Sequence, residues 1–152
     1  MTSNDSLLFA IRTHVYAHFA ATTHAPTAAA IARAFAISPA AAGEALLALH
    51  DRHALFLEPG TTAIRLANPF SAVPTPYRVV AGGLTYTANC AWDSFGIPVA
   101  LGAAGARIES TCAATGRPIV LNIAGGRLDR DGPEVVHFLV PFRHWYDDLI
   151  HT

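Results

Sequence analysis

The sequence predicts an α+β protein in which a helical module precedes a module built on a small sheet. Apolar residues recur at three- and four-residue spacing up to Leu49, whereas beyond Asn68 short β-type runs alternate with glycine-rich turns. We therefore expect a winged-helix-like three-helix module over residues 1–67 and a linker over residues 68–76. Residues 77–152 are then expected to form a mixed or antiparallel sheet domain with short helices.

The first module is expected to hold three helices and a β-hairpin. An apolar stripe at helical spacing indicates the first helix, and its members are Leu8, Ile11, Val15 and Phe19. Helix-start signals, in which Thr or Ser is paired with Pro, predict a second helix over residues 26–36 and a third over residues 38–52. Residues 54–57 and 63–66 flank a Pro-Gly turn, which is typical of a hairpin.

The second module is expected to be mainly β. Apolar and β-branched runs bounded by glycine predict strands at residues 77–81, 84–87, 106–111, 119–124 and 135–140. A short helix is expected over residues 91–101, and a last helix from Phe142 to the end. The sequence contains no internal repeat.

The composition limits the chemistry that the chain can perform. Of its 152 residues, 52% are hydrophobic and only 14% are charged, and the net charge is −1. All ten basic residues are arginine. The absence of lysine excludes Schiff-base chemistry and the phosphate-binding loop that ends in Lys-Ser/Thr. No cofactor is expected, and the apolar, weakly charged composition suggests self-association into a homo-oligomer.

A winged-helix-like module suggests DNA binding, but the residues of the third helix argue against it. Base edges are read by Arg, Lys, Asn or Gln side chains. This helix begins with one proline, three alanines and Gly43, and it carries its only arginine, Arg52, at the far end. The near-zero net charge also gives no field that attracts phosphates. Nucleic acid is therefore not the expected partner, and a winged-helix transcriptional regulator stays a third hypothesis.

The sequence also indicates where the protein works. No run of about 18 apolar residues could span a membrane, and residues 1–5 lack the basic flank of a signal peptide. Two cysteines are too few for a disulfide-stapled secreted scaffold. We expect a cytoplasmic protein with no membrane partner.

Residues 89–95 are the most informative stretch. A strand gives way to a helix here, so Cys90 falls at the helix N-terminus, where free N–H groups and the helix dipole favour the thiolate. Asp93 lies on the same face of the first turn. In a secluded site, the thiolate and desolvation raise the pKa of Asp93, which can then carry a proton near neutral pH. Alternatively, Cys90 is a small buried hydrophobe and Asp93 a helix-capping carboxylate.

Two aromatic residues flank this pair. Trp92 and Phe95 are candidates for the walls of a substrate pocket that excludes water. Ordinary core packing next to a helix start is the alternative for both.

At these residues the sequence resembles the alkylmercury (organomercurial) lyases. The resemblance rests on residues 89–95, on residues 110–116 with the following Pro118, and more loosely on residues 67–71. It implies a winged-helix-like part joined to a catalytic sheet part, and protonolysis of carbon–mercury bonds in a small organomercurial or another thiophilic substrate. By this resemblance, Cys90 binds mercury transiently and Asp93 handles the proton. Mercury is a soft metal that needs thiolate ligands.

The sequence departs from the family at one point. The family uses a second reactive cysteine from its C-terminal region, and this chain has none after Cys112. The motif around Cys112 implies a structural role for that residue. The chain stops at Thr152, close to where the missing thiol is expected, so either the chain is shortened or this relative lost the group. In the second case, a non-catalytic protein that captures a soft metal or organometal through Cys90 is the alternative.

Other polar residues give weaker signals. His14 and His18 have a spacing that can bind zinc, but no third ligand is evident, and a solvated helix edge is predicted. Three C-terminal histidines, His137, His144 and His151, have no recognised ligand spacing. Asp147 and Asp148 are predicted to lie on a solvated helix face.

Overall fold

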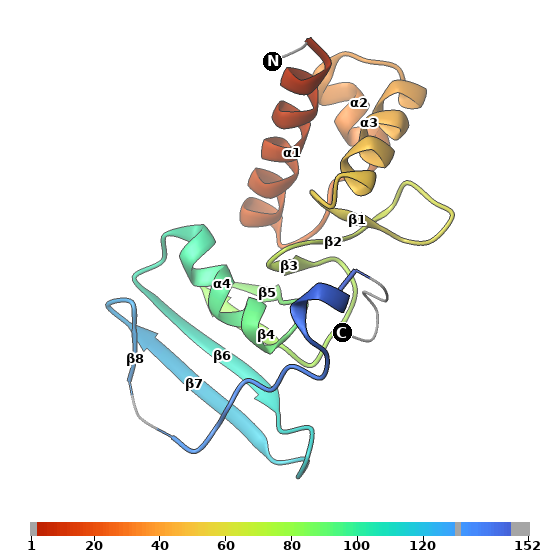
Figure 1. Cartoon of the computed structure of the whole chain (residues 1–152). Helices are drawn as coiled ribbons and strands as arrows, with labels where there is room; N and C mark the ends of the chain where they lie inside the picture. Colours follow the sequence, from red (N-terminus) through yellow and green to blue (C-terminus); the bar gives the residue numbers. More distant parts are fainter. Residues whose placement is uncertain (1–2, 130–131, 147–152) are drawn as a thin grey trace.

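A computed structural model describes residues 3–129 and 132–146. Within these ranges the chain forms four α-helices and two antiparallel sheets. Figure 1 shows three helices gathered at one end of the molecule and the larger sheet with the fourth helix at the other. The predicted α+β class is confirmed.

The three predicted N-terminal helices are present as α1 (Ser3–Thr22), α2 (Ala28–Phe35) and α3 (Pro39–Asp51). Hydroxyl side chains cap the two shorter ones, because Thr27 Oγ1 accepts from the Ala30 N–H at 3.1 Å and Ser38 Oγ from the Ala41 N–H at 3.1 Å. Each bond satisfies a backbone donor that has no partner inside its helix. The helix-start signals in the sequence are therefore the residues that begin these helices.

The predicted hairpin is also present, with one strand more than expected. β1 (Phe56–Leu57), β2 (Ile64–Ala67) and β3 (Phe70–Ser71) form a sheet in the order β1-β2-β3. β3 lies inside the stretch predicted as a linker. Whether the helices and this sheet act as a winged helix, and where the modules divide, stay predictions.

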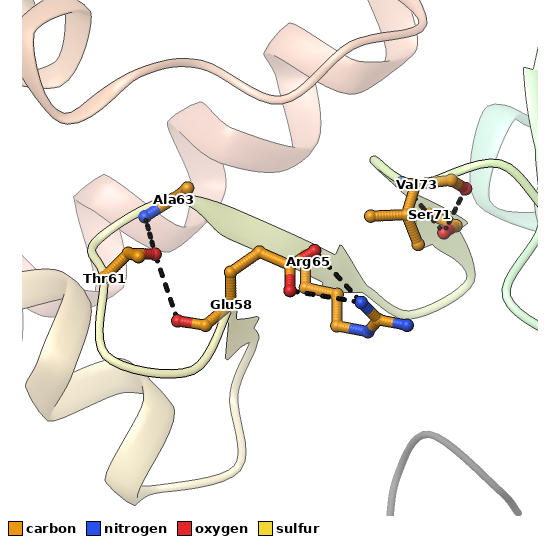
Figure 2. A network of polar contacts seen from close by, with 6 residues as sticks. All are labelled: Glu58, Thr61, Ala63, Arg65, Ser71 and Val73. Atoms are coloured by element: carbon orange, nitrogen blue, oxygen red, sulfur yellow. Dashed lines mark hydrogen bonds and ion pairs between the residues drawn. The ribbon is translucent and has the colours of Figure 1, made fainter.

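Side chains hold the hairpin turn closed, as Figure 2 shows. The Arg65 guanidinium donates to both carboxylate oxygens of Glu58, at 3.0 and 3.1 Å. Thr61 Oγ1 donates to the Glu58 carbonyl at 3.0 Å and accepts from the Ala63 N–H at 3.1 Å. These bonds set the path of the chain between β1 and β2.

The larger sheet has the strand order β5-β4-β6-β7-β8, and every neighbouring pair is antiparallel. Helix α4 (Ala91–Leu101) connects β5 to β6 and has the predicted bounds. The strands are β4 (Arg78–Ala81), β5 (Leu84–Thr87), β6 (Gly105–Thr111), β7 (Pro118–Ala124) and β8 (Arg127–Leu128).

The strand predicted over residues 135–140 is wrong. This stretch is irregular, and Leu139 within it is 76% exposed. Instead of pairing with a strand, the stretch lies beside the start of α4, where the Phe138 ring is 6.2 Å from the Trp92 ring, between centroids. The predicted C-terminal helix is a short 3₁₀ turn, Phe142–His144, as far as residue 146. Its predicted remainder lies outside the described residues.

Within residues 3–129 and 132–146, no single helix is long and apolar enough to cross a bilayer. Helices α2 and α3 together have the required length and composition, but they are bent by 111° at the break between them.

The two parts of the chain share one hydrophobic core. Phe70, in β3, stacks on Phe19 of α1 with ring centroids 5.4 Å apart and contacts Tyr86 of β5 at 5.8 Å. The Tyr86 hydroxyl donates to the Ala20 carbonyl near the end of α1, at 2.7 Å. The small β3 strand therefore joins the helical part to the larger sheet.

We predict that Phe70→Ala destabilises the whole chain by about 3–5 kcal/mol, because it empties a ring-sized volume where the two parts meet. Thermal or urea unfolding followed by circular dichroism measures the effect. The matched control is Phe9→Ala, since Phe9 is 61% exposed on α1. A loss of less than about 1 kcal/mol in the free energy of unfolding of Phe70→Ala would contradict the role of Phe70 in holding the helical part to the larger sheet.

Candidate functional site

Cys90 and Asp93 meet at the start of α4. Cys90 has extended backbone angles and caps the helix: its Sγ accepts from the Asp93 N–H at 3.5 Å. The Cys90 thiol in turn donates to Asp93 Oδ2 at 3.3 Å. The structure thus brings together the two residues that the sequence singled out, as an N-cap and the third residue of the first helical turn.

The neighbouring backbone fixes this turn. The Asn89 N–H donates to the Pro69 carbonyl at 3.2 Å, and the Ala88 N–H donates to the Tyr77 carbonyl at 2.9 Å. Gly96 faces Pro69 so closely that a Cβ on it would lie 3.1 Å from the proline Cβ. Helix α4 therefore packs directly on the segment that holds β3, and the position of Cys90 depends on that segment.

The thiol of Cys90 is protonated in the free protein. Burial raises the pKa of Cys90 to about 11, and the charge of Asp93 adds to the rise, although the Asp93 backbone N–H opposes it. The prediction that the helix N-terminus yields a thiolate is therefore wrong for this state. The cause is that desolvation of the half-buried sulfur outweighs the donors at the helix start.

The pKa of Asp93 is raised, as predicted, but only one of the two predicted causes, burial, contributes to the rise. Burial is the cause, whereas hydrogen bonds from Cys90 and from the Asn89 side chain act to lower it. The neutral thiol therefore does not contribute the negative charge that the sequence argument assumed. Since the thiol has the higher pKa of the pair, the shared proton resides on sulfur.

A pocket of about 190 Å³ opens beside this pair. The start of α4 and the C-terminal segment of residues 136–146 form much of its wall. Tyr146 in that segment also stacks on His53 of the helical part, with centroids 4.2 Å apart. The lining residues are Asn68, Tyr77, Asn89, Cys90, Ala91, Trp92, Asp93, Val136, His137, Phe138, Leu139, Trp145 and Tyr146.

The two predicted pocket aromatics lie in different places. Trp92 lines the pocket and is 59% exposed, on the side of α4 opposite its buried residues Ser94 and Ile97. Phe95 does not line the pocket and is partly buried against the core. The prediction for Phe95 is therefore corrected: a 100° rotation per residue places it on the flank of α4 nearer the core.

Cys112 is away from this pocket. It follows β6 and starts the turn to β7: the Gly116 N–H donates to its carbonyl at 2.8 Å, and its own N–H donates to the Arg117 carbonyl at 2.9 Å. Both cysteines are free. Hydrogen bonds from Thr115, first through its side chain, lower the pKa of Cys112. The predicted structural role of Cys112 remains a prediction.

The structure adds residues that sequence reasoning missed. Asn89 is one of them, because its side chain is hydrogen-bonded to Asp93. Its position next to Cys90 in the sequence was a signal that could have identified it. Asn68, Tyr77 and the segment of residues 136–139 reach the pocket only through the fold, so spacing along the chain gave no signal for them.

The histidines and aspartates noted in the sequence do not form a metal-binding cluster in the part of the chain that the structure covers. The rings of His14 and His18 lie 6.1 Å apart on α1. No group of three or more His, Cys, Asp or Glu side chains able to hold a metal occurs within residues 3–129 and 132–146. His151, Asp147 and Asp148 lie outside these ranges.

A second, wider pocket of about 540 Å³ lies between α3 and the hairpin turn. It is lined by Leu47 and His50 of α3 and by residues 57–62, none of which is a thiol. The smaller pocket is therefore the candidate site, because the paired thiol and carboxyl line it.

Comparison with known proteins identifies the family of the chain. The sequence model of the family described as alkylmercury lyase matches residues 70–150, more than half of the chain and the whole of the candidate pair. A solved structure, the mercury-bound form of MerB2, aligns with 88% of this chain and 69% of its own at 22% identity, with a TM-score of 0.63, which shows a shared fold. No curated protein matches the chain. With the family match over more than half of its length, the chain belongs to the alkylmercury lyase family.

Proposed function

We propose that the protein cleaves carbon–mercury bonds of organomercurials by protonolysis, with Cys90 as the mercury-binding sulfur and Asp93 as the proton donor. The observation that carries this proposal is the 3.3 Å contact from the Cys90 thiol to Asp93 Oδ2, beside a pocket. A soft nucleophile and an acid in direct contact are what this reaction requires.

The first step is exchange at mercury. An organomercurial R–Hg–X, in which X is a small thiolate, meets the Cys90 sulfur; the S–Hg bond forms as the Hg–X bond breaks, and X departs with the electron pair. The thiol proton moves to Asp93 Oδ2, the acceptor to which it is already hydrogen-bonded. Asp93 can hold this proton because burial raises its pKa.

The second step is protonation of carbon. The Asp93 hydroxyl gives its proton to the carbon attached to mercury, the electron pair of the C–Hg bond becomes the new C–H bond, and the hydrocarbon R–H leaves. Mercury stays divalent on Cys90, with a small thiolate taking the position that the carbon leaves, so no oxidant or reductant is needed, and Asp93 returns to the carboxylate. Exchange with a second small thiol then releases mercury as its dithiolate and returns a proton to the Cys90 sulfur. One residue thus accepts and delivers the same proton.

A protein that captures organomercurials without cleaving them is the second candidate. It is favoured by one observation: Cys90 is the one thiol that lines the pocket among the described residues, and the sequence holds only one other cysteine, Cys112. Capture requires only the sulfur, whereas cleavage also requires Asp93.

Asp93→Asn separates the two candidates. We predict that this change lowers hydrocarbon release from an organomercurial in excess small thiol by at least about 100-fold, since it removes the proton donor. With Cys112 replaced by serine in each protein, stoichiometric mercury binding persists in Asp93→Asn and is lost in Cys90→Ser, because Cys112 is also a free thiol. Gas chromatography measures the product and intact mass spectrometry the adduct.

Cys112→Ser is the matched control for this experiment and retains turnover, because Cys112 does not line the pocket. Wild-type protein that binds one mercurial at Cys90 but releases no hydrocarbon would leave the capture role alone. Turnover in Asp93→Asn within threefold of wild type would overturn the role of Asp93.

The two thiols are also predicted to differ in reactivity. At neutral pH iodoacetamide should modify Cys112 well before Cys90, because hydrogen bonding lowers the pKa of Cys112 while burial holds the pKa of Cys90 near 11. Peptide mapping of the alkylated protein across a pH series measures both rates. The Cys90 rate should keep rising well above pH 9, and a plateau below pH 8 would contradict the protonated thiol.

A further inference from the structure

Three aromatic side chains from two distant parts of the sequence form a continuous wall at the candidate pocket. Trp92 at the start of α4 lies 6.2 Å from Phe138, between ring centroids, with the rings tilted at 58°. Phe138 stacks on Trp145 at 5.2 Å. The Trp145 indole N–H donates to the Val140 carbonyl at 3.0 Å, which fixes that ring within the C-terminal segment.

This wall leaves aromatic surface uncovered next to the thiol. Trp92 is 59% exposed and Phe138 44% exposed, although both line the pocket that contains Cys90 and Asp93. Tyr77 and Tyr146 line the same pocket. Large aromatic side chains usually bury most of their surface, so those that stay exposed around a reactive group provide contact area for a ligand.

We propose that this wall binds the organic group of the substrate and selects an aryl ring over a small alkyl group. The inference rests on the proposed function and names the substrate class, arylmercurials. A pocket of about 190 Å³ is large enough, since an apolar cavity of about 150 Å³ is known to bind benzene. Offset or edge-on contacts with Trp92 and Phe138 then hold the ring.

The chemistry of mercury fixes where this ring goes. Divalent mercury with two strong ligands is linear, so the carbon lies across the metal from the Cys90 sulfur. The Asp93 carboxyl, which touches that sulfur, is beside the mercury, and the organic group extends onward into the pocket. A ring held against the aromatic wall keeps the C–Hg bond within reach of the acid, so the preference acts on orientation as well as on binding.

The test compares phenylmercury with methylmercury in wild type and in Trp92→Leu and Phe138→Leu. Taking the ratio of the two kcat/KM values, and comparing that ratio between proteins, removes the difference in intrinsic reactivity of the two C–Hg bonds. The phenyl-to-methyl ratio should fall about three- to tenfold in each leucine variant, the range expected for loss of one ring–ring contact. Trp92→Phe, which keeps a ring, should retain most of the ratio.

Phe9→Leu is the matched control, because it removes an equally exposed ring from α1, and its ratio should equal that of wild type. An unchanged ratio in both Trp92→Leu and Phe138→Leu would overturn the aryl preference while leaving the lyase function in place.

A second measurement does not depend on turnover. In an Asp93→Asn background that also carries Cys112→Ser, so that Cys90 is the remaining thiol, phenylmercury and methylmercury compete for Cys90 in excess small thiol. Intact mass spectrometry gives the equilibrium ratio of the two adducts. The phenyl adduct should predominate and lose its advantage when Trp92 or Phe138 is replaced by leucine. This result would support the ring site even if wild type released no hydrocarbon, and equal adduct ratios in all variants would overturn it.

Discussion

Burial of a thiol against a carboxyl group at the first turn of α4 is the constraint on which the candidate site depends. Neither group could be placed there alone without an energetic penalty, because each is charged in water at some accessible pH and is partly removed from water here. The hydrogen bond between Cys90 and Asp93 places one proton between them. When mercury displaces this proton from the Cys90 sulfur, the proton moves to Asp93, the nearest acceptor. Binding of mercury and protonation of Asp93 are therefore one event.

The rest of the fold keeps this turn in place and covers it. Phe70 in β3 packs between α1 and β5, and the same segment supplies Pro69, on which Gly96 of α4 rests. The helical part therefore contributes to the site by fixing the strand on which α4 packs. On the open side, residues 136–146 add aromatic rings to the pocket wall and reach back to His53.

The local signals in the sequence predicted much of this structure. Capping residues Thr27 and Ser38 marked two helix starts, and the change from strand to helix around Cys90 correctly predicted that Cys90 and Asp93 lie at a helix N-terminus. The features that the sequence did not predict depend on tertiary contacts. β3 forms because Ala67 and Phe70 pair across a tight turn, and residues 135–140 contact the start of α4 instead of a strand. Spacing could not predict the protonation of Cys90, since that depends on how deeply the fold buries the sulfur.

Infrared difference spectroscopy on mercury binding tests the central claim most directly. In a Cys112→Ser background, addition of an organomercurial at neutral pH should remove the S–H stretching band of Cys90 and create the C=O band of a protonated carboxyl group, which lasts until the carbon is protonated. The carboxyl band should be absent in Asp93→Asn. A free protein without the S–H band, or binding that leaves Asp93 ionised throughout, would contradict the transfer of the proton from sulfur to the acid.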